Sequence, residues 1–156
     1  MKKKLKENPV IAKNPAAQRD FKILETVEAG IVLQGSEVKS LRAREAQLRG
    51  AFARIDGGEL VLYGMEISPY PQAGHTAPDP QRPRKLLLHK RELVRLSNHV
   101  ATQGATLVAL RVYLKGNYVK VELGLGKGKK AFEKRETIKK RESDREIDRA
   151  VKHRNR

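Results

Sequence analysis

Hydrophobic and polar positions alternate over several short runs in the first 123 residues, a pattern typical of β-strands. Residues 51–55 and 59–63 flank Asp56-Gly57-Gly58, which predicts a β-hairpin. The strongest strand pattern, 106–114, turns at Gly116-Asn117 and returns over 118–123. Glycine at the first central position of that turn predicts a type II′ hairpin.

The region before these hairpins also has strand character. Residues 21–27 predict a strand with imperfect alternation, residues 28–30 a turn, and residues 31–33 a short apolar strand. Residues 68–83 hold five of the seven prolines and therefore predict a long loop.

Two segments have helical periodicity. The first begins near Gly35, with Ser36 as the expected N-cap and Glu37 near the positive end of the helix dipole. Val38 and Leu41 would point inward, which leaves the basic residues of this segment exposed: Lys39, Arg42 and Arg44.

The second helix is expected over residues 89–103. Leu93, Leu96 and Val100 would form its buried stripe, and Gly104 would end it. Short hairpin-connected strands with two helices predict a mainly β fold, a small antiparallel barrel with helices packed on it.

The two ends of the chain have a different composition. Residues 1–13 are basic and unpatterned, which predicts a mobile arm before a domain of residues 14–123. Residues 124–156 contain 13 Lys and Arg against 6 Asp and Glu, with few apolar residues. A helix formed by this segment would be polar nearly all round and would have no core to pack on. We therefore expect a tail that is disordered when free and helical on a charged partner. The glycines at its start, Gly124, Gly126 and Gly128, predict a flexible basic hinge.

Net charge narrows the class of partner. The 156 residues carry a formal charge of +16, an excess that indicates a polyanionic partner, with nucleic acid ahead of an anionic membrane. No apolar run approaches the ~20 residues that span a bilayer. The basic start is not followed by the apolar stretch of a signal peptide, so we expect a cytoplasmic protein.

Sites for catalysis, metals and cofactors are not evident in the sequence. There is no cysteine, and the four histidines lie ten or more residues apart, so we expect no metal site. The glycine-rich segment 124–130 lacks the spacing of a phosphate-binding loop, so we expect no nucleotide cofactor. No acid/base pair or nucleophile arrangement can be assembled, and we expect a binding protein rather than an enzyme.

A basic cluster marks the junction of the long loop and the second helix. It consists of Arg82, Arg84, Lys85, Lys90 and Arg91. Together with the cations of the first helix it predicts one basic side of the barrel. With four Tyr, three Phe and no Trp, recognition of structured RNA by shape and phosphate fits better than base stacking along a single strand.

Ordered motifs along the chain resemble the small protein B family, the tmRNA-binding proteins of bacterial trans-translation. The motifs that carry the resemblance, in family order, are Glu28-Ala29-Gly30, residues 34–43 (QGSEVKSLRA), residues 84–93 (RKLLLHKREL), Gly126-Lys127-Gly128-Lys129-Lys130 and Lys134-Arg135. Four positions depart from the family pattern: Pro15, Phe21, Glu133 and Ser143.

The resemblance implies an oligonucleotide-binding (OB) barrel, binding to the tRNA-like domain of tmRNA, and delivery with elongation factor Tu to stalled ribosomes. It also implies that the tail lies in the empty messenger path near the decoding centre. By position it adds Asn14, Glu28 and Leu87 to the basic residues as RNA-binding candidates, with Leu87 expected in the core. The RNA-binding set is thus Asn14, Glu28, Lys39, Arg42, Arg84, Lys85, Leu87 and Lys90. The ribosome-binding set of the tail is Lys127, Gly128, Lys129, Lys130, Lys134, Arg135, Lys139, Lys140, Arg141 and Val151.

Two alternatives remain at this point. A ribosomal protein or assembly factor that binds ribosomal RNA has the same composition, and only the ordered motifs separate it from the tmRNA reading. A nuclease or RNA-modifying enzyme built on an OB barrel is disfavoured because the sequence shows no acidic or metal-ligand cluster.

Overall fold

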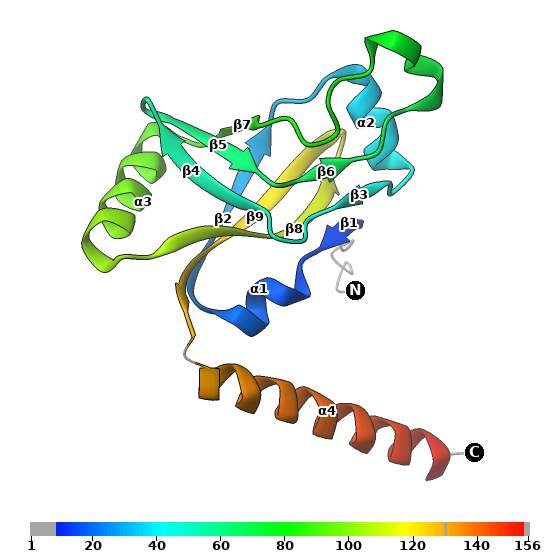
Figure 1. Cartoon of the computed structure of the whole chain (residues 1–156), viewed down its shortest axis with the longest axis vertical. Coiled ribbons are helices and arrows are strands. Elements are labelled where there is room, and N and C mark those ends of the chain that lie inside the picture. Colours follow the sequence, from blue (N-terminus) through cyan, green and yellow to red (C-terminus); the bar gives the residue numbers. More distant parts are fainter. Residues whose placement is uncertain (1–8, 130, 155–156) are drawn as a thin grey trace, which may run out of the picture.

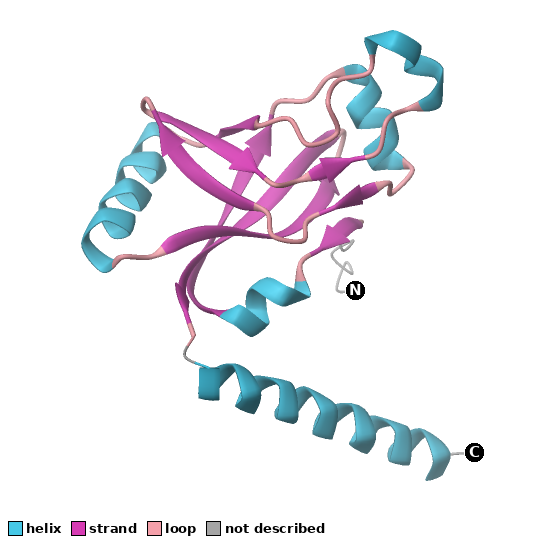
Figure 2. Cartoon of the chain, viewed as in Figure 1, coloured by secondary structure: helices cyan, strands magenta, loops and turns pink. Residues whose placement is uncertain are grey.

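The fold is a closed ring of antiparallel strands flanked by helices (Figures 1 and 2). The structure is a computed structural model and describes residues 9–129 and 131–154. The ring runs in the order β8-β4-β5-β7-β2-β9 and closes where β9 pairs with β8. These strands are β2 (Phe21–Ile31), β4 (Phe52–Asp56), β5 (Glu59–Tyr63), β7 (Arg84–Leu87), β8 (Thr106–Lys115) and β9 (Tyr118–Gly128). The predicted small antiparallel barrel is confirmed.

Shorter elements border the ring. Strand β1 (Val10–Lys13) pairs with β8, and β3 (Ala46–Gln47) pairs with β6 (Glu66–Ile67) in a separate ladder. The helices are α1 (Pro15–Asp20), α2 (Gly35–Arg42), the 3₁₀ helix η1 (Pro71–Thr76), α3 (Lys90–Gln103) and α4 (Ala131–Arg154). In Figure 1, α3 and α1 lie against different sides of the barrel, α2 and η1 form a lobe at the upper right, and α4 extends below.

The interior of the ring holds the core because strand side chains alternate between its two faces. From β8, Leu107, Ala109 and Val112 point inward, with a register shift between Ala109 and Arg111 that keeps the inward alternation. The opposite face of β8 is also apolar, because Val108 and Leu110 pack against Ala17 of α1 and against Phe21 and Ile23. Covering on both faces explains why the sequence of β8 is nearly continuous in apolar residues.

Helices α2 and α3 each contribute one fully buried leucine, Leu41 and Leu96, to the same core. Gly104 ends α3 in the left-handed conformation with φ 61°, as predicted. The expected N-cap of α2 was wrong by two residues. Gln34 caps the helix, and its N–H donates to Glu37 Oε1 at 2.9 Å in a capping box.

Both predicted hairpin turns are confirmed. Gly57 and Gly58 join β4 to β5 with positive φ at both positions, as a type I′ turn requires. In the β8–β9 turn φ is positive at Gly116 only, as a type II′ turn requires.

Strand β2 is continuous over residues 21–31, so the predicted turn at residues 28–30 was wrong. Glu28, Ala29 and Gly30 pair with Glu122, Val121 and Lys120 of β9. Gly30 also pairs with Leu87 of β7, and a Cβ at Gly30 would lie 3.4 Å from Leu87 Cβ. Glycine marks a close approach here, not a reversal of the chain.

The predicted mobile arm of residues 1–13 was too long at its C-terminal end. Residues 10–13 form β1, and Leu114 N–H donates to Pro9 O at 2.9 Å. Residues 1–8 lie outside the described residues. Residues 10–13 become a strand by pairing with β8, about 100 residues away in the sequence. The local sequence of this short segment therefore could not predict the strand.

The predicted hinge at residues 124–128 is instead the end of β9. Gly124 pairs with Thr26 and Val108, and Gly126 with Ile23 and Thr106. A Cβ at Gly124 would lie 3.0 Å from Leu110 Cδ1, and one at Gly126 would lie 3.0 Å from Phe21 Cβ. These glycines are required by packing under α1, and the barrel therefore extends to about residue 128 rather than to 123.

Residues 131–154 form helix α4, whereas the sequence predicted a tail that is disordered when free. The segment contains no Gly or Pro and is rich in good helix formers, which favours the helix locally. Its contact with the barrel includes a hydrogen bond from Arg141 Nη2 to Gln18 Oε1 of α1 at 3.4 Å. Ile138, Ile147 and Val151 stay exposed, so the predicted lack of a buried face is confirmed.

Candidate nucleic-acid interface

An outward groove of about 520 Å³ lies where β2, β7 and β9 meet the start of α3. The residues that line it are Glu28, Gly30, Leu87, Leu88, His89, Glu92 and Lys120. A Cβ at Gly30 would lie 3.4 Å from Leu87 Cβ and 3.8 Å from Lys120 Nζ, so glycine leaves space between these two side chains. The groove brings together Glu28 and Leu87, two of the RNA-binding candidates implied by the family resemblance.

The Glu28 carboxylate is held in place by two donors from β8. Tyr113 donates its hydroxyl to Oε2, and Lys115 Nζ donates to Oε1 at 3.1 Å. The hydroxyl bond from Tyr113 and the nearby Lys115 and Lys120 lower the pKa of Glu28 below its ordinary value, against the opposing effect of burial. Burial and the bond to Glu28 raise the pKa of Tyr113, which keeps its phenol protonated as the donor. The result is an oriented anionic acceptor, suited to a base N–H or a ribose 2′-OH.

Leu87 is 52% exposed, so its expected place in the core was wrong. Strand β7 alternates, with Arg84 and Leu86 buried and Lys85 and Leu87 exposed. An apolar run such as Leu86-Leu87-Leu88 does not show which of its members points outward. Leu87 offers a nonpolar surface next to an acceptor and several cations, a combination that suits the face of a base or sugar.

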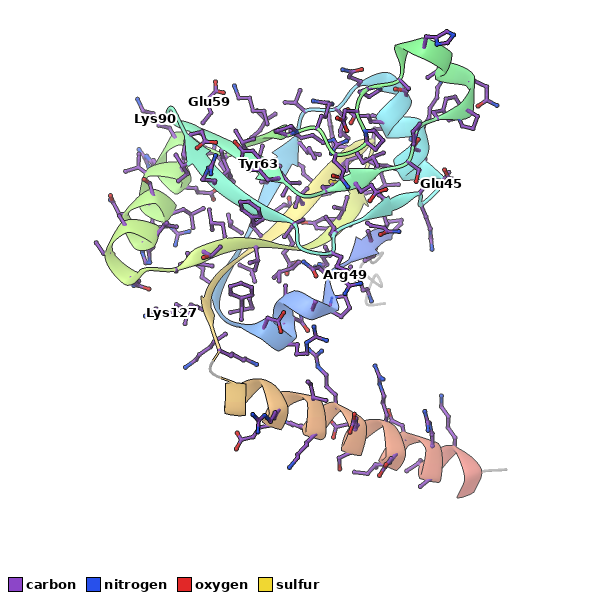
Figure 3. All side chains as sticks on the ribbon, in the orientation of Figure 1. Glu45, Arg49, Glu59, Tyr63, Lys90 and Lys127 are labelled. Carbon is purple, nitrogen blue, oxygen red and sulfur yellow. The ribbon has the colours of Figure 1, made fainter. Side chains whose placement is uncertain are left out.

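Lysines border the groove. Lys120 lines it, Lys115 contacts Glu28, and Lys85 shares the outer face of β7 with Leu87. Lys85 also pairs with Glu59 at 3.1 Å, both side chains being about half exposed. Lys90, the first residue of α3, is exposed and labelled at the upper left of Figure 3.

Sequence reasoning missed Tyr113, Lys115 and Lys120. A signal was present in the two-residue period on either side of the Gly116-Asn117 turn. That period places Tyr113 and Lys115 on one face of β8. Whether this face contacts Glu28 of β2 depends on the register of the strands in the ring. That register cannot be read from the local sequence.

Arg84 is a structural residue and does not belong to the RNA-binding set. Only 1% of its side chain is exposed, and its Nε donates to Glu37 Oε2 at 2.8 Å. Its other nitrogens donate to the carbonyl oxygens of Met65, Arg82 and Pro80 at 2.9, 3.1 and 3.0 Å. All of these bonds are internal, so Arg84 has no surface to present to RNA.

The Glu37 carboxylate also accepts hydrogen bonds from Arg82, which is partly exposed. Burial raises the pKa of Glu37, but the bonds from Arg82, from the Gln34 N–H and from Arg84 outweigh it, and the pKa is lower than usual. Glu37 therefore fastens α2, the end of the long loop and β7 to one another.

Asn14 is also buried and lies apart from the groove. Its Nδ2 donates to Ala109 O at 2.8 Å and its N–H to Leu110 O at 2.8 Å, at the junction of β1 and α1. Its Oδ1 has no hydrogen-bond partner among the described residues. The structure places Asn14 beneath the surface that Lys13 and Gln18 line, consistent with a supporting position.

Lys39 and Arg42 project from α2, in the lobe away from α4 in Figure 1. Both are exposed, as predicted, and Lys39 Nζ lies 5.2 Å from the centre of the Tyr70 ring in the long loop. That these two cations and those near β7 form one basic side of the barrel stays a prediction.

The candidates of the tail divide between β9 and α4. Lys127 and Gly128 are exposed at the end of β9, and Lys129 N–H donates to Asp20 O at 2.9 Å. On α4 the candidates Arg135, Lys139, Lys140 and Val151 are exposed, and Arg141 reaches Gln18. Lys130 and the side chain of Lys134 lie outside the described residues. Figure 3 shows Lys127 at the lower end of the barrel, where the chain leaves for α4.

Within residues 9–129 and 131–154, no three His, Asp or Glu side chains gather in a way that could hold a metal ion. In the same part of the chain no helix is both long and apolar enough to cross a membrane.

The ring, the lysine-bordered groove and the basic terminal helix define the class as an OB-type barrel of the nucleic-acid-binding kind. Residues 11–153 match the family model described as SmpB protein. The chain belongs to the SmpB protein family.

Individual relatives agree with this assignment. The chain is 54% identical to the SsrA-binding protein of Carboxydothermus hydrogenoformans, over 93% of this chain and 97% of the relative. It is 53% identical to that of Chloroflexus aggregans, over 93% and 92% of the two chains. A solved structure described as "tmRNA-SmpB: a journey to the center of the bacterial ribosome" matches with a TM-score of 0.64 and 52% identity, over 76% of this chain and 84% of that one.

Proposed function

We propose that this protein binds the tRNA-like domain of tmRNA and is required for its delivery to stalled ribosomes in trans-translation. Membership of the SmpB family, relatives named for binding SsrA RNA (tmRNA), and a matching structure of tmRNA with SmpB in the ribosome support this function. It acts as a binding protein in the cytoplasm, as a monomer when free, and elongation factor Tu joins through the aminoacylated RNA.

The observation that carries the proposal is the groove between Glu28 and Leu87. Double-stranded RNA offers side chains mainly phosphates and 2′-hydroxyls, and unpaired loop bases offer flat faces and polar edges. The groove provides one oriented carboxylate, one exposed leucine and two lysines, Lys120 in its lining and Lys115 on Glu28. This set is suited to a folded RNA with an exposed loop nucleotide.

We further propose a division of labour along the chain. The barrel, residues 10–129, holds the tRNA-like domain, and α4 occupies the empty messenger path near the decoding centre. The cations of α4 face solvent along most of its length, so they remain available to ribosomal RNA. The exposed Ile147 and Val151 are four residues apart and share one face of the helix, which can pack there.

The test compares the RNA affinity of two alanine variants, each of which shortens an equally exposed apolar side chain. Leu87 lies in the groove and Val94 on α3 outside it, and both are 52% exposed. Leu87→Ala should weaken binding of the tRNA-like fragment by about 1 kcal/mol, roughly fivefold in Kd, because half of a leucine loses its contact. Val94→Ala should bind as the wild type does, measured by fluorescence anisotropy.

The same titration separates the alternative function. Tighter binding to a ribosomal RNA helix of equal length than to the tRNA-like fragment would identify a ribosomal or assembly protein instead. Equal effects of Leu87→Ala and Val94→Ala would show that the groove is not the binding surface.

A further inference from the structure

The end of α2 has a geometry that normally requires glycine. Ala43 is the C-cap, and the next residue, Arg44, has φ 59°. Arg44 N–H donates to Leu41 O at 2.9 Å and Glu45 N–H to Ser40 O at 3.0 Å. These two bonds are those of a Schellman motif, in which the residue at the Arg44 position is usually glycine because it must be left-handed.

Arginine at this position is unfavourable for the fold. A side chain in the left-handed region brings Cβ close to the backbone, a penalty that glycine avoids. Seven other described residues have positive φ, and all seven are glycines. The chain therefore uses glycine wherever the backbone demands it within residues 9–129 and 131–154, except at Arg44.

The surroundings of Arg44 do not explain the exception. Its side chain is exposed, and no described carboxylate forms an ion pair with it or with Arg42. Arg42 already supplies a cation in the last turn of α2, where it favours the helix dipole. Figure 3 shows Glu45, the residue that follows Arg44, at the outer edge of the lobe and away from the barrel interior.

The helix that precedes Arg44 is bonded to the barrel. Glu37, seven residues before Arg44 and about two helical turns away, is bonded to the buried Arg84 and to Arg82. Lys39 and Arg42 are three residues apart and share one face of the helix. Lys39, Arg42 and Arg44 are exposed and have no carboxylate partner among the described ion pairs, although Lys39 lies over the Tyr70 ring. Cations of this kind are suited to contact the phosphates of an RNA backbone.

We propose that Arg44, together with Lys39 and Arg42, forms a second RNA contact surface that binds backbone phosphates of the same RNA that occupies the groove. This inference rests on the proposed function and adds to it a site on the α2 lobe. Arg44 contributes a phosphate contact at the expense of fold stability, which explains why arginine stands at a glycine position.

The test uses one substitution with effects of opposite sign on two properties. Arg44→Gly relieves the backbone and removes the charge. It should raise the thermal midpoint by about 2 to 5 °C. It should also weaken binding of the tRNA-like fragment by about three- to tenfold near 0.1 M salt and lower the slope of log K against log salt by about one.

Two further variants complete the design. Arg44→Lys keeps the charge and the strain, so it should keep the salt slope and the thermal midpoint of the wild type. Arg95→Gln removes one exposed positive charge on α3, where Arg95 pairs with Glu25, and should leave the slope unchanged.

The outcomes separate this inference from the proposed function. If Arg44→Gly binds RNA with the affinity and slope of the wild type, or lowers the thermal midpoint, the second surface is wrong while the proposed function stands. If the wild-type protein does not bind the tRNA-like fragment, the proposed function itself fails.

Discussion

Replacing Glu37 by glutamine should strongly destabilise the barrel, although the change removes only a charge and keeps the shape. Glu37 is 3% exposed and accepts hydrogen bonds from Arg82, Arg84 and the Gln34 N–H. Breaking a buried ion pair from one side costs about 3 to 5 kcal/mol, because the remaining charge stays buried without a counterion. Glutamine keeps one acceptor and Arg84 keeps its three carbonyl partners, so we expect a loss of about 3 kcal/mol.

The control is the same substitution at an exposed ion pair. Glu59 pairs with Lys85 at 3.1 Å, but the side chains are 57% and 49% exposed. Surface pairs of this kind contribute about 0 to 1 kcal/mol, so Glu59→Gln should cost little. Urea unfolding at pH 7, followed by circular dichroism, gives both free energies from the midpoints provided the slope m is unchanged.

The difference in free energy of unfolding between wild type and Glu37→Gln should depend on pH, because the pKa of Glu37 is lowered in the folded protein. A carboxyl group whose pKa is lower in the folded state stabilises the protein fully above its ordinary value of 4.5. That contribution disappears as the pH falls through the lower folded pKa. The gap between wild type and Glu37→Gln should therefore be constant from pH 7 to about 5 and shrink in more acidic solution. Equal free energies of unfolding for Glu37→Gln and Glu59→Gln at pH 7 would refute the reasoning.

Two further predictions concern the end of the barrel. Gly124→Ala should cost about 1 to 3 kcal/mol in urea unfolding, because its Cβ would lie 3.0 Å from Leu110 Cδ1. Gly128→Ala, with no atom within 4 Å of its Cβ, should be within about 0.5 kcal/mol of wild type, and equal costs would restore the hinge interpretation. A chain ending at Lys129 should bind the tRNA-like fragment as the full chain does but fail to support tagging on stalled ribosomes. Normal tagging by that truncation would show that α4 has no role there.

Features with a local cause were predictable from the sequence. The two hairpins, the end of α3 at Gly104 and the exposure of Lys39 and Arg42 follow from turn chemistry and from periodicity over a few residues. A polyanionic partner was predictable from the formal net charge of +16, because net charge depends on composition and not on the fold.

The candidate site was predictable only in part, because one sequence pattern is compatible with opposite environments. Arg84 and Lys85 are neighbours in a basic run, yet the first is buried and the second exposed. What separates them is a carboxylate 47 residues away in the sequence from Arg84. Leu87 has the composition of a core residue and lies outside, because β7 pairs with β2 and β5 in a register that turns its alternate positions outward.

The sequence by itself therefore determined the barrel class, the two hairpin turns, the end of α3 and the need for a nucleic-acid partner. The tertiary structure decided which charges are free to bind that partner and where the barrel ends. It joined Glu28 to Tyr113 and Lys115 across the ring, and it turned Gly124 from an apparent hinge into a tightly packed strand residue. The physical reason is the same in each case. Burial and hydrogen bonding depend on contacts between segments far apart in the chain, and only strand register and closure of the ring bring those segments together.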